Sequence, residues 1–153
     1  MAANPNLALV RRFFTAYADH DFEAMRNEIL APEVTWRIPG HHPLAGIKRG
    51  ADEILAYFAE LPHANFRAEP IVIAAEGDYV VDVHRGWAAY GDASLDMHWV
   101  LVYRVEQGRI TEVENFAADQ HAADAFFWRV WGDELAPLPA RMTRARAHDN
   151  ART

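Results

Sequence analysis

Two ionisable side chains, Asp82 and His84, lie two residues apart in the largely apolar segment from Tyr79 to Tyr90. Side chains at positions i and i+2 of a strand leave the same face, so this pair would share one face. Histidine has an unperturbed pKa of about 6.5, and a neighbouring carboxylate can set it as an acid or a base. His84 is therefore a candidate for proton transfer, with Asp82 orienting it or sharing its proton, but the spacing alone does not say which face of the strand looks inward. Such side chains lie about 6–7 Å apart, so contact requires a bend or a water, and the alternative is a structural or surface histidine.

A second pair, Asp96 and His98, shares one face of the next predicted strand. A tight turn at Gly91-Asp92 would place this pair roughly across from residues 84–88, within reach of His84 along one face. The alternative is an outward polar stripe on a half-solvated sheet. Both readings fit the sequence.

Asp119 precedes the last predicted helix, and Asn115 lies four residues earlier. A carboxylate that faces an apolar cavity has a raised pKa and can take a proton from a carbon next to a carbonyl. Aspartate is equally a preferred N-cap, so capping and catalysis both remain open for Asp119. Tyr17 could donate a hydrogen bond to a developing oxyanion, or it could be the last residue of a core stripe.

Aromatic residues would form the wall of a small-molecule pocket, and a loop histidine, His41, could reach its mouth. The predicted wall residues are Phe14, Trp36, Phe58, Trp99 and Phe116. The chain has no cysteine and no His-Glu-x-x-His spacing, so we expect no metal, and Asp82, His84 and His98 form the only trio that merits a test. Phosphate-binding glycine motifs are also missing, so we expect no cofactor.

The elements that must position these residues follow from periodicity. The turns between the later strands are too short for a crossover, so those strands are antiparallel neighbours. We expect an α+β fold in which a cone-shaped, curved sheet packs on three N-terminal helices, with a fourth helix at the C-terminal end. Predicted helices cover 5–18, 22–30, 51–61 and 120–135, and predicted strands cover 34–38, 66–75, 79–90, 93–105 and 109–118.

Composition narrows the class of protein. The 153 residues are 51% hydrophobic and 24% charged, which suits one globular domain, placed at residues 1–136. A net charge of −7 disfavours nucleic acid and anionic membranes as partners. No secretory signal and no apolar run of about 18 residues is visible, so we expect a cytoplasmic protein. Residues 137–153 carry four arginines against one acid and are predicted to be a flexible tail.

Three segments of the sequence, together with the aspartate that follows the third, resemble the SnoaL-like branch of the nuclear transport factor two superfamily in their order and spacing. This resemblance covers about residues 6–131 and implies a cone-shaped pocket and a homodimer. The dimer would bury the sheet face with Trp87 or the helix with Phe126-Phe127-Trp128. The segments are Leu30 to Gly40, Pro43 to Gly46 with Gly50, and Gly108 to Glu112 before Asp119-Gln120.

The resemblance also assigns roles. The strand around His84 looks like the one that bears the catalytic histidine of scytalone dehydratase, but it lacks the arginine of limonene epoxide hydrolase. Asp119 matches a pocket aspartate of SnoaL-like cyclases, and Tyr17 matches the oxygen-binding tyrosine of ketosteroid isomerase and scytalone dehydratase. The resemblance implies a cofactor-independent isomerase, cyclase or dehydratase acting on a small, largely apolar carbonyl compound. The alternatives are a non-catalytic binding or scaffold protein and, second, an epoxide hydrolase.

Overall fold

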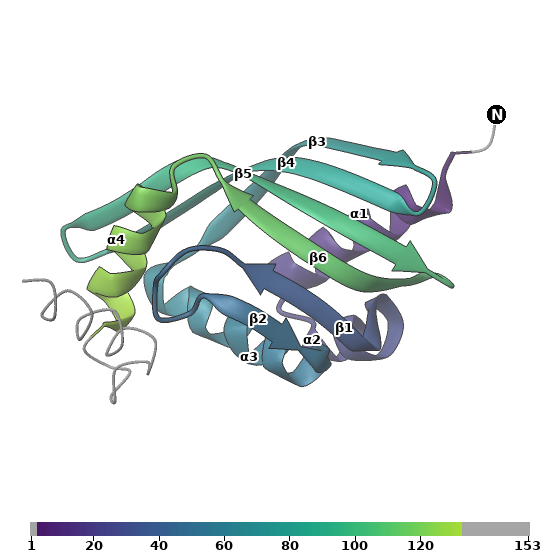
Figure 1. Cartoon of the computed structure of the whole chain (residues 1–153), viewed down its shortest axis with the longest axis horizontal. Helices are drawn as coiled ribbons and strands as arrows, with labels where there is room; N and C mark the ends of the chain where they lie inside the picture. Colours follow the sequence, from purple (N-terminus) through teal and green to yellow (C-terminus); the bar gives the residue numbers. More distant parts are fainter. Residues whose placement is uncertain (1–2, 133–153) are drawn as a thin grey trace, which may run out of the picture.

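One curved, six-stranded sheet organises the computed structural model, which describes residues 3–132, and helices α1 and α3 pack against one side of it (Figure 1). The strand order is β2-β1-β6-β5-β4-β3. The predicted α+β class is confirmed. The elements are α1 (Pro5–Ala18), α2 (Phe22–Ala24), the π-helix η1 (Met25–Ile29), β1 (Leu30–Ile38), β2 (Gly46–Arg49), α3 (Gly50–Glu60), the 3₁₀-helix η2 (Leu61–Ala64), β3 (Arg67–Glu76), β4 (Tyr79–Tyr90), β5 (Ala93–Glu106), β6 (Arg109–Ala117) and α4 (Gln120–Trp131).

The four later strands form the predicted antiparallel meander, with bounds within one residue of those expected. The first strand differs from its prediction, because β1 begins at Leu30 rather than Val34. It pairs in parallel with β6 and antiparallel with β2, a four-residue strand that the sequence did not predict. Pro32, which lacks a donor for a ladder hydrogen bond, lies at a register irregularity between Leu30 and Thr35, where its missing N–H is tolerated.

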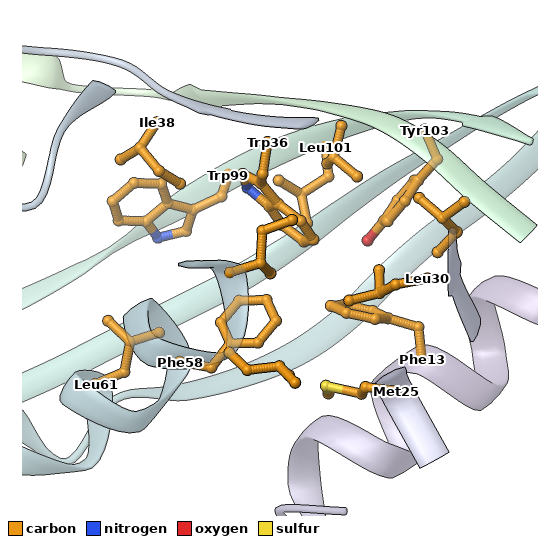
Figure 2. Packing of buried hydrophobic residues seen from close by; sticks show 14 of the residues in the cluster. Phe13, Met25, Leu30, Trp36, Ile38, Phe58, Leu61, Trp99, Leu101 and Tyr103 are labelled. Atoms are coloured by element: carbon orange, nitrogen blue, oxygen red, sulfur yellow. The ribbon is translucent and has the colours of Figure 1, made fainter. Parts of the chain in front are cut away.

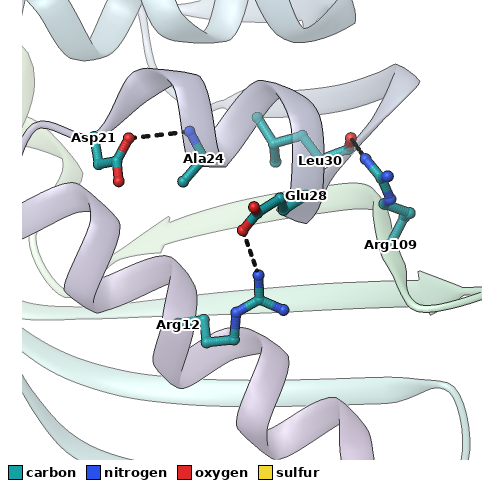
Figure 3. A network of polar contacts seen from close by, with 6 residues as sticks. All are labelled: Arg12, Asp21, Ala24, Glu28, Leu30 and Arg109. Carbon is teal, nitrogen blue, oxygen red and sulfur yellow. Dashed lines mark hydrogen bonds and ion pairs between the residues drawn. The ribbon is translucent and has the colours of Figure 1, made fainter.

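Local contacts fix the two helices that precede β1. Asn4 caps α1 by accepting a hydrogen bond from the Asn6 N–H at 2.9 Å, and Pro5 occupies the first helical position. The Asp21 side chain caps α2 in the same way, at 3.1 Å from the Ala24 nitrogen. Figure 3 shows this cap beside the Arg12 to Glu28 ion pair, which ties α1 to η1 at 2.8 Å.

Aromatic side chains fill the space between the helices and the sheet. Phe13 and Phe58 from the helices face Trp36 and Tyr103 from the strands (Figure 2). Their ring centroids lie 5.2–6.4 Å apart, which is the range of favourable aromatic pairs. This cluster holds α1 and α3 against the curved sheet.

The last helix contributes to the core. Phe126 and Phe127 of α4 are 4% and 2% exposed, so neither ring of the predicted dimer patch is available on the surface of this chain. The indole N–H of Trp128 donates to the His41 carbonyl at 2.6 Å and fastens α4 to the loop after β1. The end of the predicted helix and the basic segment 137–153 lie outside the described residues. Within residues 3–132 no helix has the length and apolar content needed to cross a membrane.

Candidate functional site

The aspartate and histidine of β4 point into the molecule and touch. Asp82 is fully buried and His84 is 9% exposed, and His84 Nδ1 lies 2.6 Å from Asp82 Oδ1. The contact is direct and has no bridging water. On the neighbouring strand Pro70 pairs with His84 while Val72 pairs with Val83, so β3 has a bulge beside the pair. A bulge increases local twist, and we attribute the direct contact to this twist.

A tyrosine that the sequence analysis missed completes the site. The Tyr103 hydroxyl donates to Asp82 Oδ2 at 2.6 Å, so each carboxylate oxygen has a hydrogen-bond partner. Burial and the nearby Asp82 raise the pKa of Tyr103 well above its usual value, which keeps the phenol protonated as a donor. We call Tyr103, Asp82 and His84 the triad.

The two contacts of Asp82 favour one tautomer of the histidine. A buried carboxylate is compatible with its charge when it accepts two good hydrogen bonds, and here they come from the Tyr103 hydroxyl and His84 Nδ1–H. With Nδ1 donating to Asp82, the lone pair of the ring is on Nε2. His84 lines the cavity described next. The arrangement can therefore accept a proton from a bound molecule.

An apolar cavity of about 80 Å³ lies between α1, α3 and the sheet. Seven of the residues predicted for the site line it, and nine residues that were not predicted line it as well, among them Tyr57, Phe66 and Arg67. The predicted residues that line it are Phe14, Tyr17, Trp36, Phe58, His84, Trp99 and Asn115.

The floor of the cavity depends on a residue without a side chain. The indole N–H of Trp99 donates to the Gly86 carbonyl at 3.2 Å and lies over this glycine. A Cβ atom at position 86 would be 2.6 Å from Trp99 Nε1, closer than real Cβ contacts. Glycine at this position therefore lets the Trp99 ring lie flat against β4.

The mouth of the cavity opens toward a surface groove of about 560 Å³. Both hollows share Tyr17, Phe66, Arg67 and Ala68. A cavity of about 150 Å³ can enclose a benzene molecule. The cavity here is smaller, about 80 Å³, so an organic ligand of benzene size or larger would extend into the groove. The exposed Arg67 brings a positive charge to this boundary.

Two phenols keep their protons at the cavity. Burial raises the pKa of Tyr17 to about 12. Burial, with a smaller contribution from Tyr17, also raises the pKa of Tyr57. Both hydroxyls are therefore neutral near pH 7 and can donate a hydrogen bond.

The structure places four predicted site residues away from the cavity. His98 and Phe116 lie on the outer face of the sheet, and Phe116 is 46% exposed. His98 pairs with the outward Arg85, and Phe116 follows the inward Asn115 by one residue, so strand alternation turns both outward.

The other two serve as structural contacts. Asp119 is exposed and accepts a hydrogen bond from the Ala122 N–H at 3.0 Å, so it caps α4 and cannot act as a base inside the cavity. His41 is exposed in the loop after β1, and its backbone N–H donates to Asp124 at 3.2 Å.

The same geometry bears on metal binding by Asp82, His84 and His98. The trio singled out in the sequence does not assemble, because His98 is on the opposite face of the sheet from Asp82 and His84. Across residues 3–132 no group of three or more His, Cys, Asp or Glu side chains is placed to hold a metal ion.

The curved sheet, the helices on one side and the cavity between them define the nuclear transport factor two-like fold, which matches a protein of unknown function from Burkholderia pseudomallei with a TM-score of 0.72. That protein is 25% identical, and the match covers 82% of this chain and 98% of the other. A family model for the SnoaL-like domain matches residues 10–113, and the chain belongs to this family.

Two further relatives agree with this assignment. An uncharacterized protein of Mycobacterium tuberculosis is 32% identical over 132 residues, which cover 83% of this chain and 99% of that protein. The structure of Bal32a, from a soil-derived mobile gene cassette, matches with a TM-score of 0.76 and 26% identity, over 80% of this chain and 95% of Bal32a.

Proposed function

We propose that this protein is a cofactor-independent acid–base enzyme that isomerises, cyclises or dehydrates a small carbonyl compound, with His84 as the base. One observation carries the proposal: a fully buried carboxylate holds Nδ1 of His84 at 2.6 Å while the ring lines an apolar cavity. A group held in this way has one proton-accepting atom available and faces a region that excludes water.

The reaction would begin with removal of a proton from the carbon next to the carbonyl. The C–H electrons move into the carbonyl, the proton goes to His84 Nε2, and the carbonyl oxygen becomes an enolate oxygen. Tyr17 or Tyr57 would donate a hydrogen bond to this oxygen. Return of the proton to another carbon gives an isomer, and loss of a hydroxyl group as water gives a dehydrated product. Asp82 orients the imidazole and stabilises the imidazolium.

The size and lining of the cavity limit the substrate. Its volume of about 80 Å³ is below the roughly 300–1,000 Å³ of sites that enclose a drug-sized ligand. A single ring of benzene size would already fill this cavity, so part of a one-ring substrate and all of any larger part would lie in the groove beside Arg67. A molecule as large as a steroid does not fit without movement of the wall.

Deuterium exchange tests the proposal without knowledge of the substrate. The protein is incubated in D₂O with a panel of small ring ketones, and mass spectrometry measures the deuterium gained next to the carbonyl. We expect exchange with at least one ketone, lowered about 10²-fold or more by His84→Gln. Asp119→Asn, which alters an exposed cap, is the matched control and should retain the rate. Equal rates in the wild type and the His84 variant would refute the assignment.

A non-catalytic binding protein of the same fold is the second candidate. The observation that favours it is that no Asp or Glu side chain among the described residues lines the cavity. His84 would then have no carboxylic acid as a second proton-transfer group. Ligand binding that survives His84→Gln, with no exchange by the wild type, would select this candidate. We do not propose epoxide opening, because both Asp82 oxygens are occupied by hydrogen bonds inside the protein.

We further propose that the protein forms a homodimer through the outer face of the sheet. Four apolar residues lie in register across β3, β4, β5 and β6 and form what we call the apolar row: Val72, Val83, Val100 and Phe116. Beside it, Val81 is paired with Val102, and Val81 is 38% exposed. An exposed apolar patch rimmed by ion pairs such as that of Arg85 with Asp96 is typical of a protein interface.

A further inference from the structure

Two residues that line the cavity each carry a buried polar atom without a hydrogen-bond partner among the described residues: the indole Nε1 of Trp36 and the side-chain Oδ1 of Asn115. Trp36 is only 3% exposed, so its N–H cannot turn to bulk solvent. Leaving a buried donor or acceptor unsatisfied is energetically unfavourable. Two such atoms on residues that line one small cavity are explained if a bound molecule supplies their partners.

The two atoms belong to neighbouring strands. Trp36 on β1 pairs with Val113 on β6, and Asn115 is the next inward residue of β6. Diagonal neighbours of this kind have Cα atoms about 7–8 Å apart, close enough for one small group to lie between the side chains. Trp36 offers only a donor there, and the unpartnered atom of Asn115 is an acceptor.

We propose that the ligand of this cavity carries a hydroxyl group that accepts a hydrogen bond from Trp36 Nε1 and donates one to Asn115 Oδ1. A hydroxyl group can satisfy both atoms, whereas an ether or a carbonyl oxygen could accept from Trp36 Nε1 but has no hydrogen to donate to Asn115 Oδ1. The inference rests on the proposed function only in taking the cavity as the ligand site. It makes the substrate class a small ring alcohol or phenol that also carries the reacting carbon.

The sheet register gives the position of the hydroxyl relative to the base. Leu101 on β5 pairs with Asp82 on one side and with Asn115 on the other, so one strand lies between the Asp82–His84 pair and Asn115. Two strand spacings of about 4.8 Å put the backbones of β4 and β6 about 10 Å apart. The hydroxyl and the carbon that loses its proton would therefore lie at opposite ends of a ring.

Three probes of similar size test the proposal: phenol, which donates and accepts, anisole, which only accepts, and toluene, which does neither. Binding is measured by titration of the five tryptophan indole N–H signals in ¹H–¹⁵N spectra. We expect phenol to bind about threefold to tenfold more tightly than anisole, and anisole to exceed toluene by a similar factor. Phenol and anisole should shift the Trp36 signal, which Trp36→Phe identifies by its loss.

Two variants should each remove one difference in binding between the probes, and a third should remove none. Trp36→Phe should abolish the difference between anisole and toluene, and Asn115→Leu should abolish the difference between phenol and anisole. His84→Gln should keep the whole ranking, even where it stops deuterium exchange, so the two proposals can fail separately. Equal binding of the three probes to the wild type needs no variant and would overturn the inference. Loss of the phenol preference in His84→Gln, with its retention in Asn115→Leu, would overturn it too.

Discussion

At the scale of single residues, spacing along one strand was enough to find two members of the triad. Asp82 and His84 are separated by one residue in an alternating segment, and such a pattern places both on one face. Tyr103 could have been found by the same reasoning, because the turn at Gly91 fixes the register of β4 and β5 and puts Tyr103 beside Asp82 on the inward face.

Asp119 shows where reasoning from residue type fails. A carboxylate before a helix suits capping and catalysis equally, and only the path of the chain between β6 and α4 decides whether it faces the cavity. In the structure it faces solvent and accepts the Ala122 N–H. The error came from the resemblance to cyclases, which supplied a role but not a side-chain direction.

The protonated state of Tyr17 predicts a stability effect at high pH. Its pKa is about 12 in the folded protein, against about 10 for an unperturbed phenol. The folded state therefore holds this proton more tightly, and the associated stability is complete below pH 10 and is lost as the pH rises toward 12. Urea unfolding at pH 9 and pH 11 should show a steeper loss for the wild type than for Tyr17→Phe.

The comparison has an internal control. Between pH 6 and pH 8 the difference in unfolding free energy between the two proteins should not change, because the phenol is protonated in both states. If the difference in unfolding free energy between the wild type and Tyr17→Phe were also constant from pH 9 to pH 11, the raised pKa of Tyr17 would be contradicted.

At the scale of elements, the meander was predictable and the first two strands were not. Short turns with glycine force neighbouring strands to be antiparallel, and this is visible in the sequence. The parallel pairing of β1 with β6 joins segments about 80 residues apart, and no local pattern encodes such a contact. β2 has only four residues, and their sequence, Gly-Ile-Lys-Arg, has no apolar–polar alternation that would reveal a strand.

The contact between β4 and Trp99 gives a prediction for one strand. Gly86→Ala would place a methyl group 2.6 Å from Trp99 Nε1, so the ring must move toward the cavity. We expect a loss of about 1–3 kcal/mol in unfolding free energy, measured by urea denaturation, and weaker binding of any cavity ligand. The matched control is Ala89→Val, an exposed position three residues along the same strand. An unchanged stability for the glycine variant would show that Trp99 is free to shift.

At the scale of the whole molecule, the outer sheet face predicts the oligomeric state. Val81 lies beside the apolar row, and Val81→Lys would place a charge in the proposed interface. Light scattering should give twice the chain mass of 17.3 kDa for the wild type and a value nearer to 17.3 kDa for the variant. Tyr90→Lys is the control, because Tyr90 is similarly exposed (37%) but lies against His63 on the other side of the sheet. A monomeric wild type at high concentration would contradict the dimer.

The triad comes from a single hairpin, since Asp82 and His84 lie on β4 and Tyr103 lies on β5. Most of the cavity wall comes instead from the first 68 residues, through α1, β1, α3 and the start of β3. The proposed proton-transfer residues and most of the cavity lining therefore lie in different parts of the sequence. Substitutions in the first 68 residues would change the shape of the cavity without altering the triad, so related proteins could keep the proposed base and bind different compounds.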